Sequence, residues 1–241
     1  MSNTTATQRK NQGSNKKVSS LRKNAFGMEL KLIQPKTEAQ RTVFETFHQN
    51  NLMLHGFAGT GKSYISLFLA LREVLEYNRY SNIVLVRSAV QTRDIGFMPG
   101  NLEEKTALYE VPYRDIVNDL CERGDAYDIL KQRGIIKFMC TSFIRGLTLN
   151  NAIVIVDEIQ NCTFSELDSV TTRLGDNSKL LLCGDFRQSD LKNQKEKQGL
   201  HDFIKVMDMM SGLEHVEFQA SDIVRSSFVK QYIINKTEAG L

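Results

Sequence analysis

Gly56-Phe-Ala-Gly-Thr-Gly-Lys-Ser63 separates two segments of different periodicity and decides the fold. It matches G-x-x-x-x-G-K-S/T, in which backbone N–H groups surround phosphates, the lysine contacts their oxygens and the hydroxyl group binds Mg²⁺. The preceding segment, Asn51-Leu-Met-Leu-His55, predicts a short strand, and the apolar spacing over residues 64–76 predicts a helix. A strand, a glycine-rich loop and a helix in this order predict a phosphate-binding loop rather than an incidental turn.

The expected nucleotide contacts lie in this loop and beside it, at Gly56, Phe57, Ala58, Gly59, Thr60, Gly61, Lys62, Ser63 and Tyr64. Lys62 starts the predicted helix, where a cation is disfavoured unless an anion joins it. A bound phosphate supplies that anion, so we expect Lys62 to contact the β/γ oxygens. Ser63 is the expected Mg²⁺ ligand, although serine is also common in the first turn of helices.

A second segment, Ile153-Val-Ile-Val-Asp157-Glu158, consists of four branched aliphatic residues followed by two acids. This pattern is typical of a buried parallel strand that delivers carboxylates to a site at its end. Neighbouring residues of an extended chain point to opposite sides, so the two acids have different roles. We expect Asp157 to hold Mg²⁺, directly or through water, and Glu158 to orient and deprotonate the attacking water. Two exposed acids at a strand end are the alternative.

A third aliphatic segment ends in polar residues: Leu180-Leu-Leu-Cys-Gly184-Asp185-Phe-Arg-Gln188-Ser-Asp190. Ligands of open α/β sheets bind at the carboxyl ends of the strands. We expect Gln188 to reach the γ-phosphate or its water, and Asp185 to couple that state to a nucleic-acid surface. By itself, a Gly-Asp-x-x-Gln sequence usually forms a turn. It indicates a functional site here because it follows the other two segments along the chain.

The three segments, in this order, resemble the first motor domain of superfamily 1 helicases. Four stretches resemble motifs of the PhoH family more closely: Phe97-Met-Pro-Gly-Asn-Leu-Glu-Glu-Lys105, Arg145-Gly-Leu-Thr-Leu149, Ile153-Val-Ile-Val-Asp-Glu-Ile-Gln-Asn161 and Asp222-Ile-Val-Arg225. The resemblance spans about residues 34–236. It implies an ATP-binding P-loop protein linked to RNA metabolism, from a bacterium or from a phage acting in its host's cytoplasm.

The resemblance also implies roles for two residues outside the three segments. Gln40 matches the adenine-reading glutamine of related motor domains, with an ordinary glutamine on a helix surface as the alternative. Arg225 matches the arginine of the family's Asp-x-x-Arg segment and is expected to contact the γ-phosphate of its own subunit or of a neighbour. A surface arginine in a salt bridge is its alternative. The residue after it is Ser226, where histidine is common in the family, which puts one local contact in doubt. The expected catalytic residues are therefore Lys62, Glu158, Gln188 and Arg225.

A long connection between Arg87 and Glu103, rich in Gly, Pro and polar residues, is the candidate nucleic-acid loop. Its basic and hydroxyl side chains could follow a single-stranded backbone, with Phe97 available for stacking: Arg87, Ser88, Arg93 and Lys105. A surface loop held to the core by Phe97 and Met98 is the alternative. Analogy with helicase motifs adds Thr141, Ser142 and Arg145 as a second set.

Six segments predicted as strands alternate with predicted helices, which indicates a three-layer α/β/α fold of the RecA-like P-loop NTPase type with a largely parallel sheet. The strands are expected at 52–55, 82–87, 135–140, 152–157, 179–184 and 214–218, and the helices at 37–48, 62–77, 103–123, 163–174, 199–211 and 223–235. Residues 26–34 are expected to add a short strand. We expect residues 29–241 to form one domain, too short for two motor domains. A neighbouring subunit is then expected to supply an arginine finger, which favours a homo-oligomer such as a hexameric ring.

Residues 1–28 contain six lysines and arginines and no acid, a composition typical of a disordered tail. Without this tail the formal charge of +3 becomes −3, so the predicted domain is not basic overall. The tail is consistent with binding RNA phosphates or acidic partners, or with a solubilising or transit-like extension. The four cysteines lack paired spacing, and no apolar run approaches 18 residues, so we expect a reduced cytoplasmic protein without a membrane segment.

Together these features predict an ATPase that hydrolyses Mg²⁺-ATP and couples the cycle to binding or moving on RNA or, less favoured, single-stranded DNA. One alternative is an ATP-gated module that recruits a ribonuclease or ribosome-associated partner with little turnover. Another is a small-molecule kinase. Glu158 beside Asp157, together with Gln188, favours water as the phosphate acceptor.

Overall fold

The computed structural model describes residues 27–88, 102–188 and 194–240, and the side chains of these residues except 102–106 and 194–197. Six strands of the described residues form one sheet in the order β3-β2-β4-β5-β1-β6, and all its neighbouring strands are parallel. The strands are β1 (Asn51–Gly56), β2 (Asn82–Arg87), β3 (Ile136–Cys140), β4 (Ala152–Asp157), β5 (Lys179–Gly184) and β6 (Leu213–Phe218). Each predicted strand from 52–55 onward is confirmed to within a residue or two.

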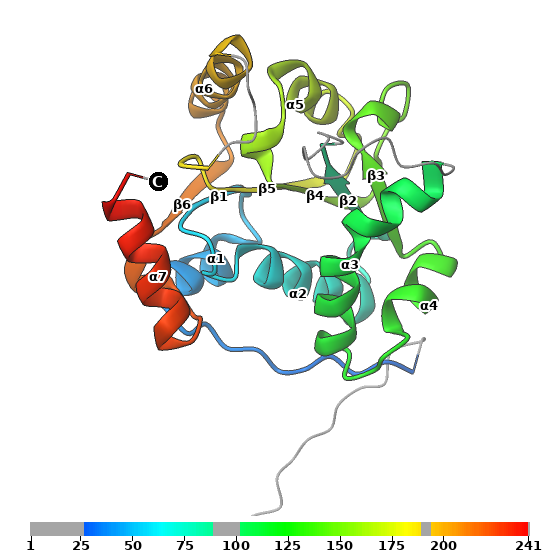
Figure 1. Ribbon diagram of the computed structural model, residues 1–241. Helices are drawn as coiled ribbons and strands as arrows, with labels where there is room; N and C mark the ends of the chain where they lie inside the picture. Colours follow the sequence, from blue (N-terminus) through cyan, green and yellow to red (C-terminus); the bar gives the residue numbers. More distant parts are fainter. Residues whose placement is uncertain (1–26, 89–101, 189–193, 241) are drawn as a thin grey trace, which may run out of the picture.

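Helices cover both faces of the sheet, which confirms the three-layer α/β/α prediction (Figure 1). One face carries α1 (Glu38–Thr46), α2 (Lys62–Leu75), α3 (Leu102–Leu120) and α4 (Ala126–Gln132), and the other carries α5 (Phe164–Thr171) and α6 (Gln194–Asp208). The last helix, α7 (Ser227–Glu238), follows β6 and has no buried residue. The sequence assigned residues 103–123 to one helix and missed α4, which begins after a break at Gly124.

The two cores explain why the central strands are continuously aliphatic. In β4, Ile153 and Ile155 face the core beneath α1 to α4, whereas Val154 and Val156 face the core beneath α5 and α6. Side chains of a strand alternate between faces, so a sheet covered on both sides needs apolar residues at every position. Each fully buried aliphatic side chain of this kind contributes about 1.5–3 kcal/mol to folding.

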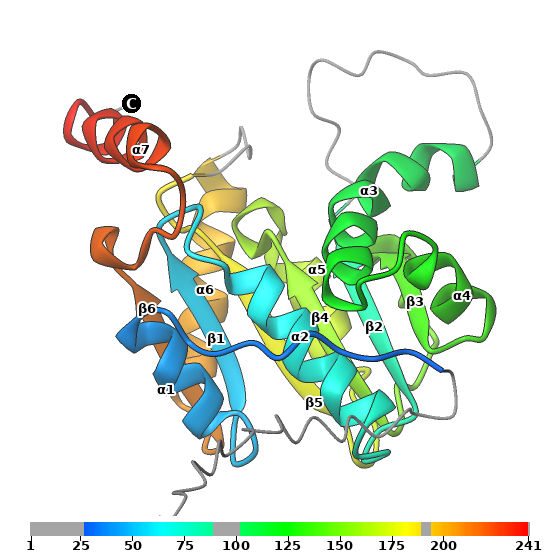
Figure 2. The ribbon, with the colours of Figure 1, turned by 90° about the horizontal axis from the view of Figure 1, so that it is seen from below.

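The strand expected over residues 26–34 is wrong, because residues 27–35 are extended but do not pair with the described sheet. Met28 and Leu30 are buried in the core beneath α1 to α4, whereas Leu32 is 83% exposed. The N–H of Lys31 donates to the carbonyl oxygen of Leu120 at the end of α3, 2.8 Å away. Figure 2 shows this segment in dark blue crossing the helical layer over α2. The alternating apolar residues therefore pack against helices, which separate the segment from the described strands.

Candidate nucleotide site

The carboxyl ends of β1, β4 and β5 border a cleft of about 530 Å³. Parallel strands that start together also end together, so three segments far apart in the sequence meet at this edge. Most of the expected nucleotide and catalytic residues line the cleft: Ala58, Gly59, Gly61, Lys62, Ser63, Tyr64, Asp157, Glu158, Gln188 and Arg225. The phosphate loop, the acid pair and the Gly-Asp-x-x-Gln segment therefore face one space.

The phosphate loop requires glycine at positions where the backbone adopts positive φ. Gly56, Gly59 and Gly61 have φ of 121°, 75° and 87°. At Gly56 a Cβ atom would lie 2.1 Å from the carbonyl oxygen of Phe218 on β6. The N–H of Phe57 donates to that same oxygen at 3.0 Å, so the loop begins tightly held against the last strand.

Gly56→Ala is expected to lower the free energy of unfolding by about 2–4 kcal/mol, because the new methyl group overlaps a backbone atom that is hydrogen-bonded in place. Urea denaturation measures this change. The matched control is Gly146→Ala, where φ is +84° but no atom lies within 4 Å of the added Cβ. Gly146→Ala should lower the free energy of unfolding by only about 1 kcal/mol, through backbone strain alone. Equal losses in the two variants would contradict the overlap as the cause.

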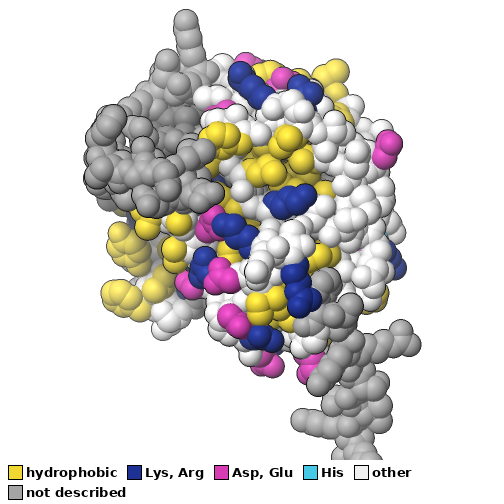
Figure 3. Space-filling model, turned by 90° about the vertical axis from the view of Figure 1, so that its right-hand side faces the viewer, with side chains coloured by type: hydrophobic (Ala, Val, Ile, Leu, Met, Phe, Trp, Pro, Cys, Tyr) yellow, Lys and Arg dark blue, Asp and Glu magenta, His cyan; other side chains and the backbone are white. Residues whose placement is uncertain are grey.

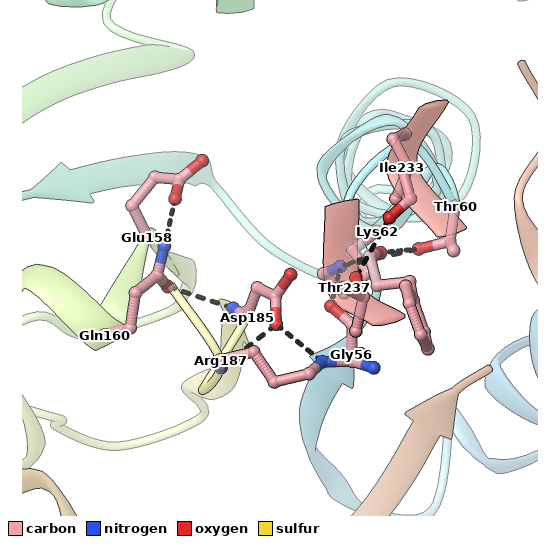
Figure 4. A network of polar contacts seen from close by, with 10 residues as sticks. Gly56, Thr60, Lys62, Glu158, Gln160, Asp185, Arg187, Ile233 and Thr237 are labelled. Carbon is pink, nitrogen blue, oxygen red and sulfur yellow. Dashed lines mark hydrogen bonds and ion pairs between the residues drawn. The ribbon is translucent and has the colours of Figure 1, made fainter. Parts of the chain in front are cut away.

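Lys62 is the first residue of α2, and its ammonium group lies inside the curve of the loop. It donates to the carbonyl oxygens of Gly56 at 2.9 Å and Phe57 at 2.8 Å (Figure 4). Burial lowers the pKa of Lys62, so the folded protein holds this charge at a cost. The N–H groups of the first turn of α2 have no acceptor within the helix and add positive potential. This combination of donors fits the oxygens of a polyphosphate.

Ser63 and Asp157 form the pair that fits Mg²⁺. The Ser63 hydroxyl, in the first turn of α2, lies 3.0 Å from both carboxylate oxygens of Asp157 at the end of β4. Among the described residues, no cluster of three or more His, Cys, Asp or Glu side chains could hold a metal ion by itself. Mg²⁺ commonly binds one or two protein oxygens and completes its shell with phosphate oxygens and water. The pair therefore suits a metal that arrives with a nucleotide.

Glu158 leaves the line of β4 because its backbone is left-handed, with φ 55° and ψ 44°, a conformation that is uncommon for glutamate. Burial and then the neighbouring Asp157 charge raise the pKa of Glu158. The amide group of Gln160 donates to the Glu158 carboxylate and accepts the N–H of Asp185 at 3.0 Å (Figure 4). Gln160 therefore links the acid pair to the loop after β5. Its motif was visible in the sequence, but nothing there pointed to this role.

The loop after β5 is held by ionic and aromatic contacts. The buried Asp185 carboxylate accepts from Nε of Arg187 at 3.2 Å, and the Arg187 guanidinium lies 3.4 Å from the centre of the Phe57 ring. This stacking joins the β5 loop to the phosphate loop. Gln188 is exposed at the rim of the cleft, and its N–H donates to the Asp185 carbonyl oxygen at 3.0 Å. The expected roles of Gln188 and Asp185 stay predictions.

Arg225 lies against the phosphate loop of its own subunit. The N–H of Val224 donates to the carbonyl oxygen of Gly59 at 3.1 Å, and Cγ of Arg225 lies 2.9 Å from the position of a Cβ atom built on Gly59. The expected contact of Arg225 with the γ-phosphate, in its own subunit or a neighbour's, stays a prediction.

Gln40 is buried beside the loop, so its interpretation as an ordinary glutamine of a helix surface is wrong. Its amide group accepts the N–H of Lys36 at 2.7 Å and donates to the carbonyl oxygen of Thr60 at 2.9 Å. A second cavity of about 210 Å³ is lined by Gln40 together with Ile33, Tyr64, Val224 and Arg225. This cavity shares Gly59 and Gly61 with the larger cleft, which is the relation expected of a base pocket and a phosphate site. Adenine reading by Gln40 stays a prediction.

The expected nucleic-acid contacts at Ser88 and Thr141 need correction. Their side chains are only 6% and 1% exposed, and both hydroxyl groups donate to the carboxylate of Glu166. Glu166 also accepts the N–H of Thr163 at 2.8 Å, which completes a capping box at the start of α5. These hydroxyls therefore fasten the ends of β2 and β3 to α5. The Thr163-x-x-Glu166 spacing was the available sequence signal for Glu166.

Two further nucleic-acid candidates, Arg87 and Arg145, have side chains that the structure describes. Arg87 lines the nucleotide cleft, and its guanidinium lies 5.5 Å from the centre of the Tyr109 ring. Arg145 is exposed after β3. Arg93 and Phe97 lie outside the described residues, as do residues 1–26 of the expected tail, and Lys105 lies in α3 with its side chain outside the description. Arg87 and Arg145 follow neighbouring strands, because Arg87 at the end of β2 is in register with Cys140 at the end of β3.

A glycine-rich loop between β1 and α2, facing an aspartate at the end of β4 in a parallel α/β/α sheet, defines the P-loop NTPase class. Within that class, residues 32–236 match the family model described as "PhoH-like protein". The chain belongs to the PhoH family, which confirms the resemblance seen in its motifs.

Curated relatives include a PhoH-like protein of Bacillus subtilis (strain 168), 36% identical over 213 residues, covering 88% of this chain and 65% of the relative. Protein PhoH of Escherichia coli (strain K12) is 32% identical over 202 residues, covering 83% of this chain and 56% of the relative. The chain thus spans less than two thirds of these relatives. Among solved structures, the large terminase of a thermophilic bacteriophage has a TM-score of 0.49 at 14% identity, covering 83% of this chain and 50% of that one. Pif1 helicase from Candida albicans has a TM-score of 0.42 at 16% identity, covering 86% and 44%.

In the described part of the chain, none of the helices combines the length and the apolarity that crossing a bilayer requires.

Proposed function

We propose that this protein binds Mg²⁺-ATP, hydrolyses its γ-phosphate and couples the cycle to RNA or, less favoured, to single-stranded DNA. The observation that carries the proposal is the single cleft that contains Lys62, the Ser63–Asp157 pair and Glu158. Phosphoryl transfer has a loose transition state, so it needs positioning and charge neutralisation more than covalent chemistry. A cationic loop opposite two carboxylates supplies both requirements.

In this proposal the base lies in the smaller cavity and the phosphates cross the start of α2. Gln40 holds the Thr60 carbonyl and so keeps the loop in shape beside the base. Lys62 exchanges its two carbonyl acceptors for phosphate oxygens. Ser63 and Asp157 hold the metal ion, which neutralises charge on the β- and γ-phosphates when bound.

Glu158 accepts a proton from the attacking water, and Gln160 keeps its carboxylate in place. Its raised pKa moves it toward the range useful for a general base. Gln188 and Arg225 approach the γ-phosphate from the rim of the cleft. Arg225 acts within its own subunit, and assembly into a homo-oligomer such as a hexameric ring stays a prediction, as does the cytoplasmic location.

Steady-state ATP hydrolysis, measured with and without single-stranded RNA, tests the proposal. We expect turnover that rises with RNA and is lost in Glu158→Gln, a variant that also controls for contaminating ATPases. ATP binding with negligible hydrolysis in both conditions would contradict the ATPase. It would favour instead the gated module that recruits a ribonuclease or ribosome-associated partner.

An exposed phenylalanine and an exposed arginine that follow β3 support the nucleic-acid part of the proposal. Phe143 is 47% exposed, and Nη2 of the exposed Arg145 makes a 3.4 Å contact with the Ser165 hydroxyl. Figure 3, seen from the side of β3 and α4, shows lysine and arginine side chains beside exposed hydrophobic ones, with acidic side chains among them. Cations and aromatic rings side by side suit the backbone and bases of a single strand.

Arg145→Glu is expected to weaken RNA binding about 10-fold and to reduce the slope of affinity against salt by about one unit, as loss of one phosphate contact predicts. Fluorescence anisotropy with labelled single-stranded RNA over a salt series measures both quantities. Lys205→Glu, an equal change of charge on α6, should leave RNA affinity near that of the wild type. Similar losses in the two variants would indicate a general charge effect instead of a site at Arg145.

A further inference from the structure

Helix α3 contacts Asp157 of the candidate metal pair and Tyr64, the residue directly after Ser63. The Tyr113 hydroxyl donates to Oδ2 of Asp157 at 3.0 Å. Six residues further along α3, Asp119 accepts the hydroxyl of Tyr64 at 2.7 Å, and Tyr64 directly follows Ser63. One helix therefore holds the turn that carries Ser63 and the carboxylate of Asp157.

Packing holds the Tyr113 side chain in place. Its residue is 2% exposed, and its ring lies against Phe138 of β3 with centroids 5.9 Å apart. Pro112, the residue before Tyr113, has no N–H group to donate to the hydrogen bonds within the helix. Both Pro112 and Tyr113 line the nucleotide cleft, so this irregular part of α3 forms one of its walls.

The orientation of the Asp157 carboxylate depends on Tyr113, because this carboxylate is buried and few hydrogen-bond donors reach it. Its residue is 8% exposed, and its carboxylate accepts hydrogen bonds from the hydroxyl groups of Ser63 and Tyr113. Ser63 is the residue expected to turn its oxygen toward a metal ion. Tyr113 is then the donor that keeps Oδ2 in place. Outer partners of this kind orient ligating carboxylates and influence metal affinity.

We propose that Tyr113 is a positioning residue that holds Asp157 in the orientation a divalent cation needs, so that α3 sets the metal affinity of the nucleotide site. The inference rests on the proposed Mg²⁺-nucleotide site. It goes beyond that site by assigning control of metal affinity to a helix outside the phosphate loop and the acid pair.

The test is Tyr113→Phe in the full chain, with Mn²⁺ as the probe in the presence of ADP. Electron paramagnetic resonance of free Mn²⁺ measures metal affinity without turnover. We expect Mn²⁺ binding about 10-fold weaker than in the wild type, the lower end of the usual effect of losing an outer partner. Binding of ADP in the presence of EDTA should be unchanged, because Tyr113 acts on the metal ligand.

Tyr127→Phe is the matched control, since Tyr127 is also fully buried and its hydroxyl donates to the Glu110 carboxylate of α3 at 2.8 Å. Both Tyr127→Phe and Tyr113→Phe are expected to lower the unfolding midpoint. Tyr127→Phe should keep wild-type Mn²⁺ affinity. Mn²⁺ affinity of Tyr113→Phe within about twofold of the wild type would overturn the inference, because losing an outer partner usually costs about 10-fold or more. Equal weakening in both variants would also overturn it. A wild-type protein that binds neither ADP nor Mn²⁺ would overturn the proposed nucleotide site itself.

Discussion

Lys62→Ala is expected to abolish ATP binding or to weaken it severely. The ammonium group of Lys62 lies inside the phosphate loop at the positive end of α2, and burial already lowers its pKa, so the fold tolerates this charge only where an anion can join it. Removing one partner of a buried charge pair costs about 2–5 kcal/mol, or about 30-fold to several thousand-fold in affinity. Isothermal titration with Mg²⁺-ATP measures the loss.

The matched control for Lys62→Ala is Lys179→Ala. Lys179 is a buried lysine that, like Lys62, donates to a backbone carbonyl, that of Asn50 at 2.6 Å, and burial lowers its pKa to about 8. It starts β5, at the opposite end of the strand from the cleft. Lys179→Ala should reduce stability but retain ATP affinity. Wild-type ATP affinity in Lys62→Ala would contradict the assignment of the loop as the phosphate site.

Glu158→Gln is expected to retain ATP binding and to lower turnover about 10²–10⁴-fold, the usual contribution of a general base. The amide has nearly the same shape as the carboxylate and leaves the cleft intact, but it cannot take the proton of the attacking water. Steady-state phosphate release and single-turnover hydrolysis give the rate, and titration calorimetry gives the affinity.

Glu110→Gln controls for the loss of a buried carboxylate away from the cleft. Glu110 is 4% exposed and accepts from Tyr127 and Lys131 between α3 and α4. We expect this variant to unfold more easily while its turnover stays near that of the wild type. Hydrolysis at the wild-type rate in Glu158→Gln would remove Glu158 from the proposed role as the base that deprotonates water.

The fold and the centre of the candidate site were predictable because both depend on short-range rules. The residues of β4 had to be apolar on two faces, and only glycine avoids the backbone atoms that crowd Gly56. The motif around Lys62 and the acids ending β4 are each contiguous in the sequence. The order of these segments was therefore enough to predict one shared edge of a parallel sheet.

The partners of polar side chains could not be predicted in this way. Tyr113 lies 44 residues from the aspartate it contacts, and Ser88 lies 78 residues from Glu166. The sequence around a serine at a strand end is the same whether its side chain faces nucleic acid or a buried carboxylate. Likewise, the alternating residues 27–35 suit a strand or a segment packed on helices, and only their position over α2, away from the described strands, decides between the two.

The sequence by itself determined the parallel α/β/α architecture, the phosphate loop and the two acids, because backbone periodicity and glycine geometry are local properties. Only the tertiary structure decided which groups hold those acids in place: Tyr113 on Asp157, and Gln160 between Glu158 and Asp185. The physical reason is that a buried polar group must find a hydrogen-bond partner, and packing brings that partner from whichever element lies nearest in space.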